Sequence, residues 1–231
     1  MLVLGIESST PVASAALVGP AGLVGEITLN IGLTHSEQLL PLIVDLLDQS
    51  RVTMENVAGI AISGGPGSFT GLRIGMATAK ALAQGRNIPL LSVPTLQALA
   101  YTQCISGGLV SPVMNARKSE VYAALFRFQG LTFAQIESDR AIAPADWVKI
   151  LATHGQPVVF VGDGVDIYST TWLELGELAV RPLEILQGAR ASTVAWLGRR
   201  RLVAGERDDL YSLKPFYIRP VETELKLACP K

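Results

Sequence analysis

The chain opens with Leu2-Val-Leu-Gly-Ile-Glu-Ser-Ser-Thr-Pro-Val-Ala-Ser-Ala-Ala-Leu-Val18, and this stretch decides the fold. Residues 2–6 are apolar or glycine and predict a buried strand. The polar, proline-containing residues 7–11 predict a turn, and the small and branched residues 12–18 predict a second strand. The chain therefore begins with a β-hairpin whose first strand is followed directly by an acidic residue, Glu7.

The same design returns half-way along the chain. Residues 110–115 predict a buried strand that ends in Asn115, a polar turn follows, and residues 120–128 predict the returning strand. An internal duplication explains this repeat. It predicts an α/β protein of two duplicated lobes, each a mixed sheet flanked by helices, with residues 1–105 in the first lobe and residues 106–231 in the second.

A glycine-rich loop follows an apolar strand of the first lobe. Residues 57–63 predict the strand, Gly64-Gly-Pro-Gly67 the loop, and a helix is expected from Thr70 to about residue 84. Glycines leave backbone N–H groups open to an anion, and a helix N-terminus favours negative charge. The loop lacks the lysine of the GxxxxGK[ST] phosphate-binding motif, however, and a tight strand-to-helix connection explains it equally well.

A vestigial nucleotide site is the functional interpretation of these features. Its candidate residues are Glu7, Gly65, Gly67 and Asn115. Glu7 and Asn115 would face each other across the cleft between the lobes, but an amide lacks the negative charge that a hard cation prefers. The sequence therefore predicts no catalytic residue, no bound metal and no cofactor.

Two helices are candidates for a partner interface. Small residues recur every four positions after the glycine loop and form one ridge: Gly71, Gly75, Ala79 and Ala83. An earlier amphipathic helix carries three large apolar residues: Leu39, Ile43 and Leu46. Such a ridge admits a neighbour at close range, and the neighbour is either a partner protein or the chain's own sheet.

The composition limits the partners and the location. The chain has 19 Lys and Arg against 20 Asp and Glu, and a net charge of -1 is not typical of a nucleic-acid-binding protein. Cys104 and Cys229 form no CxxC pair, and no apolar run reaches the roughly 18 residues of a membrane span. We expect a cytoplasmic protein without a membrane anchor that touches RNA only indirectly.

Five stretches spread over nearly the whole chain carry a family resemblance. They are Gly5-Ile-Glu-Ser-Ser-Thr10, His35-Ser-Glu-Gln-Leu-Leu-Pro-Leu-Ile43, Gly65-Pro-Gly-Ser-Phe-Thr-Gly-Leu-Arg-Ile-Gly75, Asn115-Ala-Arg-Lys-Ser-Glu-Val-Tyr122 and Pro215-Phe-Tyr-Ile-Arg219. In this order they resemble the TsaB family, which belongs to the bacterial machinery that makes threonylcarbamoyladenosine in tRNA. The resemblance implies the two-lobed fold of actin, sugar kinases and Hsp70.

The resemblance also implies a role without catalysis. The catalytic paralogue, TsaD, holds a metal through a His-x-x-x-His helix, and this chain has Thr95 and Leu99 at the two matching positions. Without imidazole ligands the Lewis acid of the reaction is missing. The family then implies a partner subunit that binds and activates TsaD, reaches the ATPase TsaE through it, and pairs with itself when alone. It places the two candidate interface helices on the face that meets TsaD or a second copy.

Two other functions stay open. A small ATP-dependent phosphotransferase of the same fold would need a lysine or paired carboxylates around the phosphates. A metallopeptidase-like protein would need metal ligands where Thr95 and Leu99 stand. Most relatives have an aspartate where this chain has Asn115, so the role of that position is open.

Overall fold

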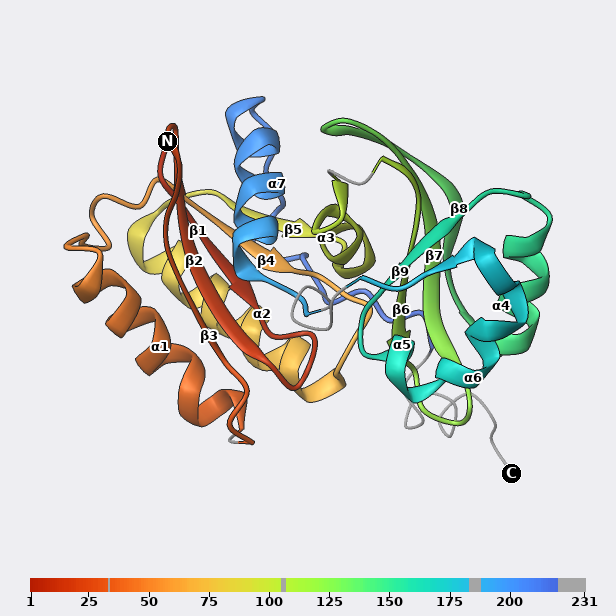
Figure 1. Ribbon diagram of the computed structural model, residues 1–231. Helices are drawn as coiled ribbons and strands as arrows, with labels where there is room; N and C mark the ends of the chain where they lie inside the picture. Colours follow the sequence, from red (N-terminus) through yellow and green to blue (C-terminus); the bar gives the residue numbers. More distant parts are fainter. Residues whose placement is uncertain (33, 105–106, 183–187, 220–231) are drawn as a thin grey trace.

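The computed structural model describes residues 1–32, 34–104, 107–182 and 188–219. Figure 1 shows two lobes side by side, each built on one five-stranded mixed sheet with helices against its faces. Helices α3 (Thr95–Tyr101) and α7 (Ala191–Val203) lie where the lobes meet. The α/β fold of two mixed sheets flanked by helices, predicted from the sequence, is confirmed.

The first sheet has the strand order β3-β2-β1-β4-β5. Its strands are β1 (Val3–Glu7), β2 (Ala13–Gly19), β3 (Gly22–Leu29), β4 (Gly59–Ser63) and β5 (Leu90–Val93). The first three strands are antiparallel neighbours, whereas β4 and β5 run parallel to β1. The opening hairpin therefore forms as the sequence predicted.

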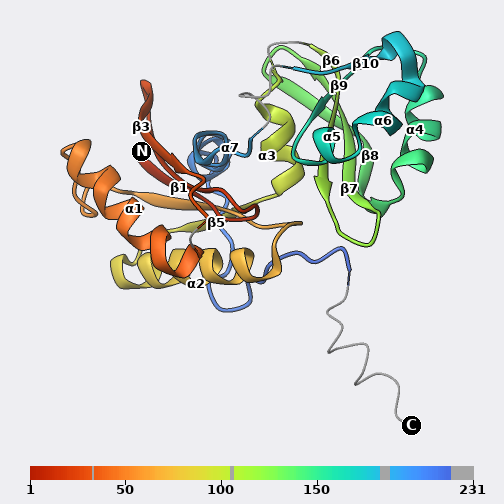
Figure 2. The same ribbon diagram turned by 60° about the horizontal axis from the view of Figure 1, so that its bottom comes forward.

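Helices cover both faces of this sheet, which explains why β1 and β2 are buried along their whole length. Helices α1 (His35–Gln49) and α2 (Phe69–Arg86) pack on one face, and α7 packs on the other (Figure 2). Side chains alternate between the two cores: Leu4 and Ile6 join the α1 and α2 side, and Val3 joins the α7 side.

The second sheet has the order β10-β9-β6-β7-β8. Its strands are β6 (Gly108–Asn115), β7 (Val121–Gln129), β8 (Thr132–Ile142), β9 (Val158–Val161) and β10 (Ala179–Val180). Helix α3 packs on one face, and four short helices contribute to the core of the other: α4 (Pro144–Ala152), α5 (Gly164–Ile167), α6 (Ser169–Trp172) and the 3-10 helix η2 (Leu173–Leu178).

The two sheets share one topology. Each begins with a three-stranded antiparallel meander, β1-β2-β3 or β6-β7-β8, and continues with two strands that run parallel to the first. The duplication inferred from the repeated hairpin is thus visible in strand order and direction. It places the two hairpin turns at equivalent positions in the two lobes.

The lobe assignment needs one correction. The sequence prediction put residues 106–231 into the second lobe, but α7 packs on β1, β2 and β4 of the first sheet. The following segment stays there, since the Asp208 backbone N–H donates to the Leu90 carbonyl (3.0 Å). The chain therefore returns to the first lobe after β10. The predicted boundary at residues 105–106, and Cys229, lie outside the described residues.

Candidate functional site: the interlobe cleft

A polar cleft of about 500 Å³ lies between the two hairpin turns. The first lobe contributes residues 9–11 of the β1–β2 turn and residues 67–70 at the start of α2. The second lobe contributes residues 114–117 and Tyr122 of the β6–β7 hairpin, with Asp163. The duplicated fold builds this cleft, because equivalent turns face each other across it.

Glu7 lies beneath the cleft and does not line it. Its side chain is fully buried, and Oε1 accepts hydrogen bonds from the Ser9 backbone N–H (2.6 Å) and hydroxyl (2.5 Å). The neighbouring Ser8 backbone N–H donates to the Ser63 hydroxyl (3.3 Å). Two backbone donors of the β1–β2 turn are therefore already used by the chain itself, which leaves neither for an incoming phosphate.

Burial raises the pKa of the Glu7 carboxyl above its ordinary value of 4.5, although hydrogen bonds from Ser9 and Ser63 partly oppose this. Oε2 has no hydrogen-bond partner among the described residues. A buried carboxylate with one unpaired oxygen is costly, which is the physical reason for the upward shift. Glu7 is thus buried under the turn, where it bonds Ser9 and does not reach the cleft surface.

This placement predicts how Glu7→Gln changes stability with pH. Because the folded-state pKa is raised, the proton adds stability that is present below the unfolded-state pKa and lost as pH rises through the folded-state value. The amide does not titrate and can still accept from Ser9. We expect the wild type to lose stability relative to the variant as pH rises above about 4.5, and thermal melts at a series of pH values measure this difference. The exposed Glu55→Gln is the control, and equal slopes for both variants would contradict this account.

Gly65 and Gly67 serve close packing. Gly65 has a φ of 114°, and a Cβ there would strike the Phe216 carbonyl oxygen of the C-terminal segment. A Cβ on Gly67 would strike the Ser9 carbonyl oxygen. The Ser9 carbonyl also accepts from the Ser68 backbone N–H (2.6 Å), so the glycine loop sits directly on the β1–β2 turn. Of the two glycines, only Gly67 lines the cleft.

Asn115 does line the cleft, and it shapes the turn beside it. Its Oδ1 accepts from the Arg117 backbone N–H (3.0 Å), and its own backbone N–H donates to Asp163 Oδ1 (3.0 Å). Arg117, Lys118 and Ser119 then follow with positive φ angles of 60°, 51° and 58°. Neither Asp163 nor this left-handed turn was predicted from the sequence to be part of the site. The Gly162-Asp-Gly164 stretch signals only a turn in sequence.

Thr95 and Leu99 occupy structural positions. Thr95 is buried, and its hydroxyl accepts from the Gly65 backbone N–H (3.0 Å) while its own backbone N–H donates to the Gly65 carbonyl (2.8 Å). Leu99 belongs to the apolar core between α3 and the second sheet. Within the described residues, no group of three or more His, Cys, Asp or Glu side chains could hold a metal ion.

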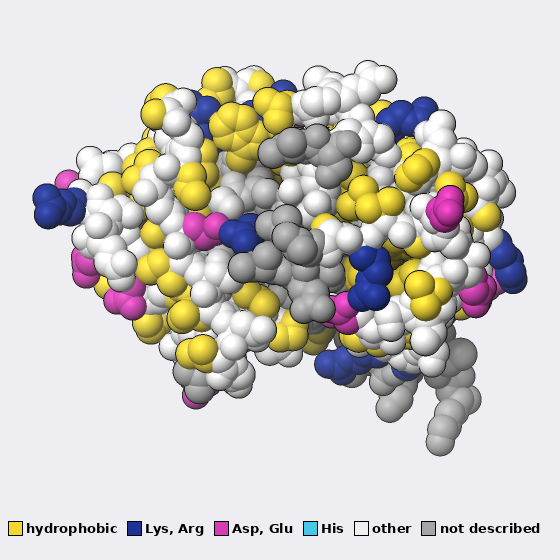
Figure 3. Space-filling model, viewed as in Figure 1, with side chains coloured by type: hydrophobic (Ala, Val, Ile, Leu, Met, Phe, Trp, Pro, Cys, Tyr) yellow, Lys and Arg dark blue, Asp and Glu magenta, His cyan; other side chains and the backbone are white. Residues whose placement is uncertain are grey.

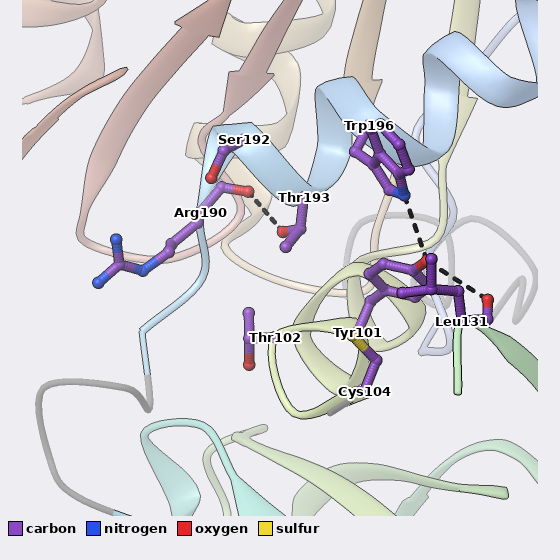
Figure 4. A pocket seen from close by; sticks show the side chains of 8 residues that line it. All are labelled: Tyr101, Thr102, Cys104, Leu131, Arg190, Ser192, Thr193 and Trp196. Carbon is purple, nitrogen blue, oxygen red and sulfur yellow. Dashed lines mark hydrogen bonds between the residues drawn. The ribbon is translucent and has the colours of Figure 1, made fainter. Parts of the chain in front are cut away.

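A second hollow, of about 340 Å³, lies between α3 and α7 at the other end of β7 (Figure 4). Trp196 Nε1 donates to the Tyr101 hydroxyl (3.2 Å), which donates to the Leu131 carbonyl (3.3 Å), and the Thr193 hydroxyl donates to the Arg190 carbonyl (2.8 Å). The walls are mostly apolar, and these polar groups bond to one another. The interlobe cleft is therefore the better candidate site.

The predicted interface residues are buried inside the chain, so that prediction is wrong for them. Leu39, Ile43 and Leu46 are each at most 2% exposed in the core under the first sheet. Gly71 and Gly75 of α2 face Ser8: its carbonyl oxygen lies against Gly71 and its hydroxyl against Gly75. Ala79 and Ala83 of α2 lie in the same core as Leu39. Small residues every four positions allow the β1–β2 turn and β4 to approach α2, and the sequence pattern does not distinguish this from a partner contact.

Comparisons with known proteins agree with the fold and the motifs. The family model for TsaD, tRNA N6-adenosine threonylcarbamoyltransferase, matches residues 24–226. The tRNA threonylcarbamoyladenosine biosynthesis protein TsaB of Bacillus subtilis is 30% identical over 227 residues, which cover 98% of this chain and 97% of that protein.

Two solved structures support the fold. YeaZ from Pseudomonas aeruginosa superposes with a TM-score of 0.76 at 24% identity and covers 94% of this chain and 99% of that one. The ROK hexokinase of Thermus thermophilus superposes with a TM-score of 0.50 at 12% identity, covering 87% and 99% of the two chains. The fold is thus that of the actin-like ATPases and sugar kinases, and the nearly full-length match to TsaB shows that the chain belongs to the TsaB family.

Proposed function

We propose that this chain is a non-catalytic partner subunit in the formation of threonylcarbamoyladenosine in tRNA, binding and activating TsaD. Its curated TsaB relative is named for that biosynthesis. The proposal rests on Thr95 and Leu99, the two positions that the family resemblance matches to the metal-binding histidines of TsaD. Thr95 bonds the glycine loop and Leu99 fills a core, so neither position offers a metal ligand.

The β1–β2 turn supports the same conclusion. In a nucleotide-binding protein of this fold class, turn N–H groups and acidic side chains would face the phosphates and their metal. Here the Ser9 N–H is bonded to Glu7 and the Ser8 N–H to Ser63. A phosphate would have to break these bonds and leave a buried carboxyl without its donors, which costs about 1–3 kcal/mol for each unsatisfied buried group.

A phosphotransferase of the same fold is the second candidate, because the cleft is polar and holds both Arg117 and Asp163. Phosphoryl transfer needs positioned cations and metal-binding carboxylates. Asp163 is the only carboxylate among the described residues that line the cleft. A metallopeptidase-like activity is disfavoured by Thr95 and Leu99.

We predict that the isolated chain does not turn over ATP at an enzyme-like rate. Typical enzymes have rate constants of about 1 per second or more. Phosphate release from Mg-ATP should therefore stay far below about 1 per second at saturating nucleotide. A rate near that value, lost in Asp163→Asn and kept in the control Asp166→Asn outside the cleft, would replace the partner proposal with the phosphotransferase.

We place the partner-binding face on the outward sides of α1 and α2. Leu40 and Val44 of α1 are 52% and 48% exposed, one residue beyond the buried Leu39 and Ile43. Apolar side chains and acidic ones lie together over α1 in Figure 3. The two helices pack side by side, so their outward faces form one continuous surface (Figure 2). The proposed interface lies on the same two helices that were predicted from the sequence. It uses their solvent-exposed faces, which are opposite to the buried faces of that prediction.

Charge favours self-pairing of this surface when TsaD is absent. The Asp and Glu side chains of α1 are Glu37, Asp45 and Asp48, and the helix has no Lys or Arg; burial lowers the pKa of the buried histidine at its start. All charged side chains of α2 are basic, namely Arg73, Lys80 and Arg86. A two-fold pair could set α1 of one copy against α2 of the other, because such interfaces are self-complementary. TsaD and a second copy would then compete for one face.

Contacts with tRNA would be indirect. Each residue of the run Arg199-Arg200-Arg201 donates to a backbone carbonyl of this chain: Met1 (3.0 Å), Leu131 (3.4 Å) and Ser92 (3.0 Å). These arginines hold α7 in place, so we propose that tRNA and TsaE are reached through TsaD. None of the described helices is both long enough and apolar enough to span a membrane.

A further inference from the structure

The C-terminal segment of the described chain crosses from one lobe to the other. Leu213 still packs against the core of the first lobe, and the segment then passes the glycine loop and the start of α2 before it reaches the second lobe (Figure 2). Residues 213–219 are called the strap below. None of the functions considered above assigns a role to these residues.

Four contacts attach the strap to the first lobe. The Phe216 backbone N–H donates to the Gly64 carbonyl (2.7 Å), and its carbonyl lies where a side chain on Gly65 would otherwise be. Tyr217 packs on Phe69, with ring centroids 5.3 Å apart, and its hydroxyl accepts from Arg73 Nε (3.3 Å).

One residue fastens the strap to the second lobe. The Arg219 guanidinium donates to the Ala116 carbonyl (3.2 Å) and forms an ion pair with Glu120. Ala116 and Glu120 flank the left-handed residues Arg117, Lys118 and Ser119, and the Ala116 N–H donates to the Glu120 carbonyl (2.9 Å). Arg219 therefore binds the residues at both ends of a left-handed segment. This backbone conformation is energetically unfavourable for L-residues.

The position of the strap decides its effect. Phe69 and Ala116 both line the interlobe cleft, so the strap runs along the side where that cleft opens. The lobes also meet through α3 and α7, and these two helices are joined at the other end of β7, where Trp196 bonds Tyr101 beside the second hollow. Lobes joined through these helices without the strap could hinge, since inter-lobe interfaces within a chain are commonly mobile.

We propose that the strap determines how far the interlobe cleft opens and that Arg219 is the residue that attaches the strap to the second lobe. The strap bonded to both lobes holds the left-handed turn and the start of α2 at one separation. Release of Arg219 frees the lobes to move about the α3 and α7 connection. This inference does not rest on the partner function, because it concerns one chain alone.

The test measures the separation of the lobes in the full chain. Spin labels on cysteines introduced at the exposed Gln84 of α2 and Asp166 of α5 report that distance, in a background of Cys104→Ala and Cys229→Ala. We expect one narrow distance distribution with the native strap. In Arg219→Ala the distribution should broaden towards longer distances, and the Phe216 amide should exchange with solvent about tenfold faster.

Arg207→Ala is the matched control, because it removes an exposed arginine just before the strap and should leave the distances unchanged. A chain ending at residue 213 removes the contacts of Phe216, Tyr217 and Arg219 and should broaden the distribution at least as much as Arg219→Ala. If that chain fails to fold, Arg219→Ala decides alone, since it keeps the strap backbone. A narrow, native distance distribution in Arg219→Ala would overturn the proposal, whether or not Phe216 exchanges faster.

Discussion

Gly75→Leu is expected to destabilise the folded chain by about 3 kcal/mol, the upper end of the usual cost of overpacking. A Cβ at this position would overlap the Ser8 hydroxyl and lie 3.2 Å from Ile62 Cδ1. The β1–β2 turn is fixed by its own hydrogen bonds and cannot withdraw without breaking them. The free energy of unfolding, from urea denaturation monitored by circular dichroism, should therefore fall sharply.

Gly85→Leu is a control within the same helix. A Cβ on Gly85 meets nothing within 4 Å, and leucine favours a helix over glycine by up to about 1 kcal/mol. We expect this variant to be as stable as the wild type or slightly more so. If Gly75→Leu were equally stable, the small-residue ridge would not be packed against the β1–β2 turn, and it would return as a candidate partner surface.

Val44→Arg is expected to weaken binding to TsaD by about 30-fold or more while leaving the fold intact. A residue at the centre of an interface can cost 2 kcal/mol or more when it is altered, and an unpaired buried charge adds to that cost. A second copy would meet the new cation with the basic helix α2, so self-association should weaken as well. Titration calorimetry with TsaD and sedimentation of the chain alone measure the two effects.

Val24→Arg is the matched control for the interface. Val24 lies on the edge strand β3 and is 52% exposed, close to the 48% of Val44. It lies outside the proposed face, so TsaD binding should be unchanged. Equal binding by both variants, with both chains folded, would show that the outward face of α1 does not meet TsaD and that the interface must be sought elsewhere.

The fold was predictable because the same local pattern of strand, polar turn and strand occurs in both halves of the chain. The repeated hairpins, the strand before the glycine loop and the amphipathic helices all appear in the structure close to the expected residues. The return of α7 to the first lobe was not predictable, since its burial pattern fits either sheet. Only the three-dimensional path shows that Val194 and Leu197 pack in the core that contains Val3.

The site was only partly predictable from sequence. Asn115 and Gly67 do line the cleft, but Glu7 lies beneath it and Gly65 lies under the strap. Periodicity identifies the apolar side of a helix but not what covers it. Leu39, Ile43 and Leu46 were therefore predicted to contact a partner, although the first sheet covers them. Asp163 was missed, because a lone aspartate between glycines signals only a turn.

The central claim, a non-catalytic subunit that TsaD requires, is tested most directly by reconstitution. Threonylcarbamoyladenosine in tRNA would be measured by mass spectrometry with TsaD and the other components of the system, with and without this chain, and with this chain in place of TsaD. The account predicts modification when both proteins are present, much less with TsaD alone, and none with this chain alone. Modification by this chain without TsaD, or equal modification by TsaD without this chain, would contradict it.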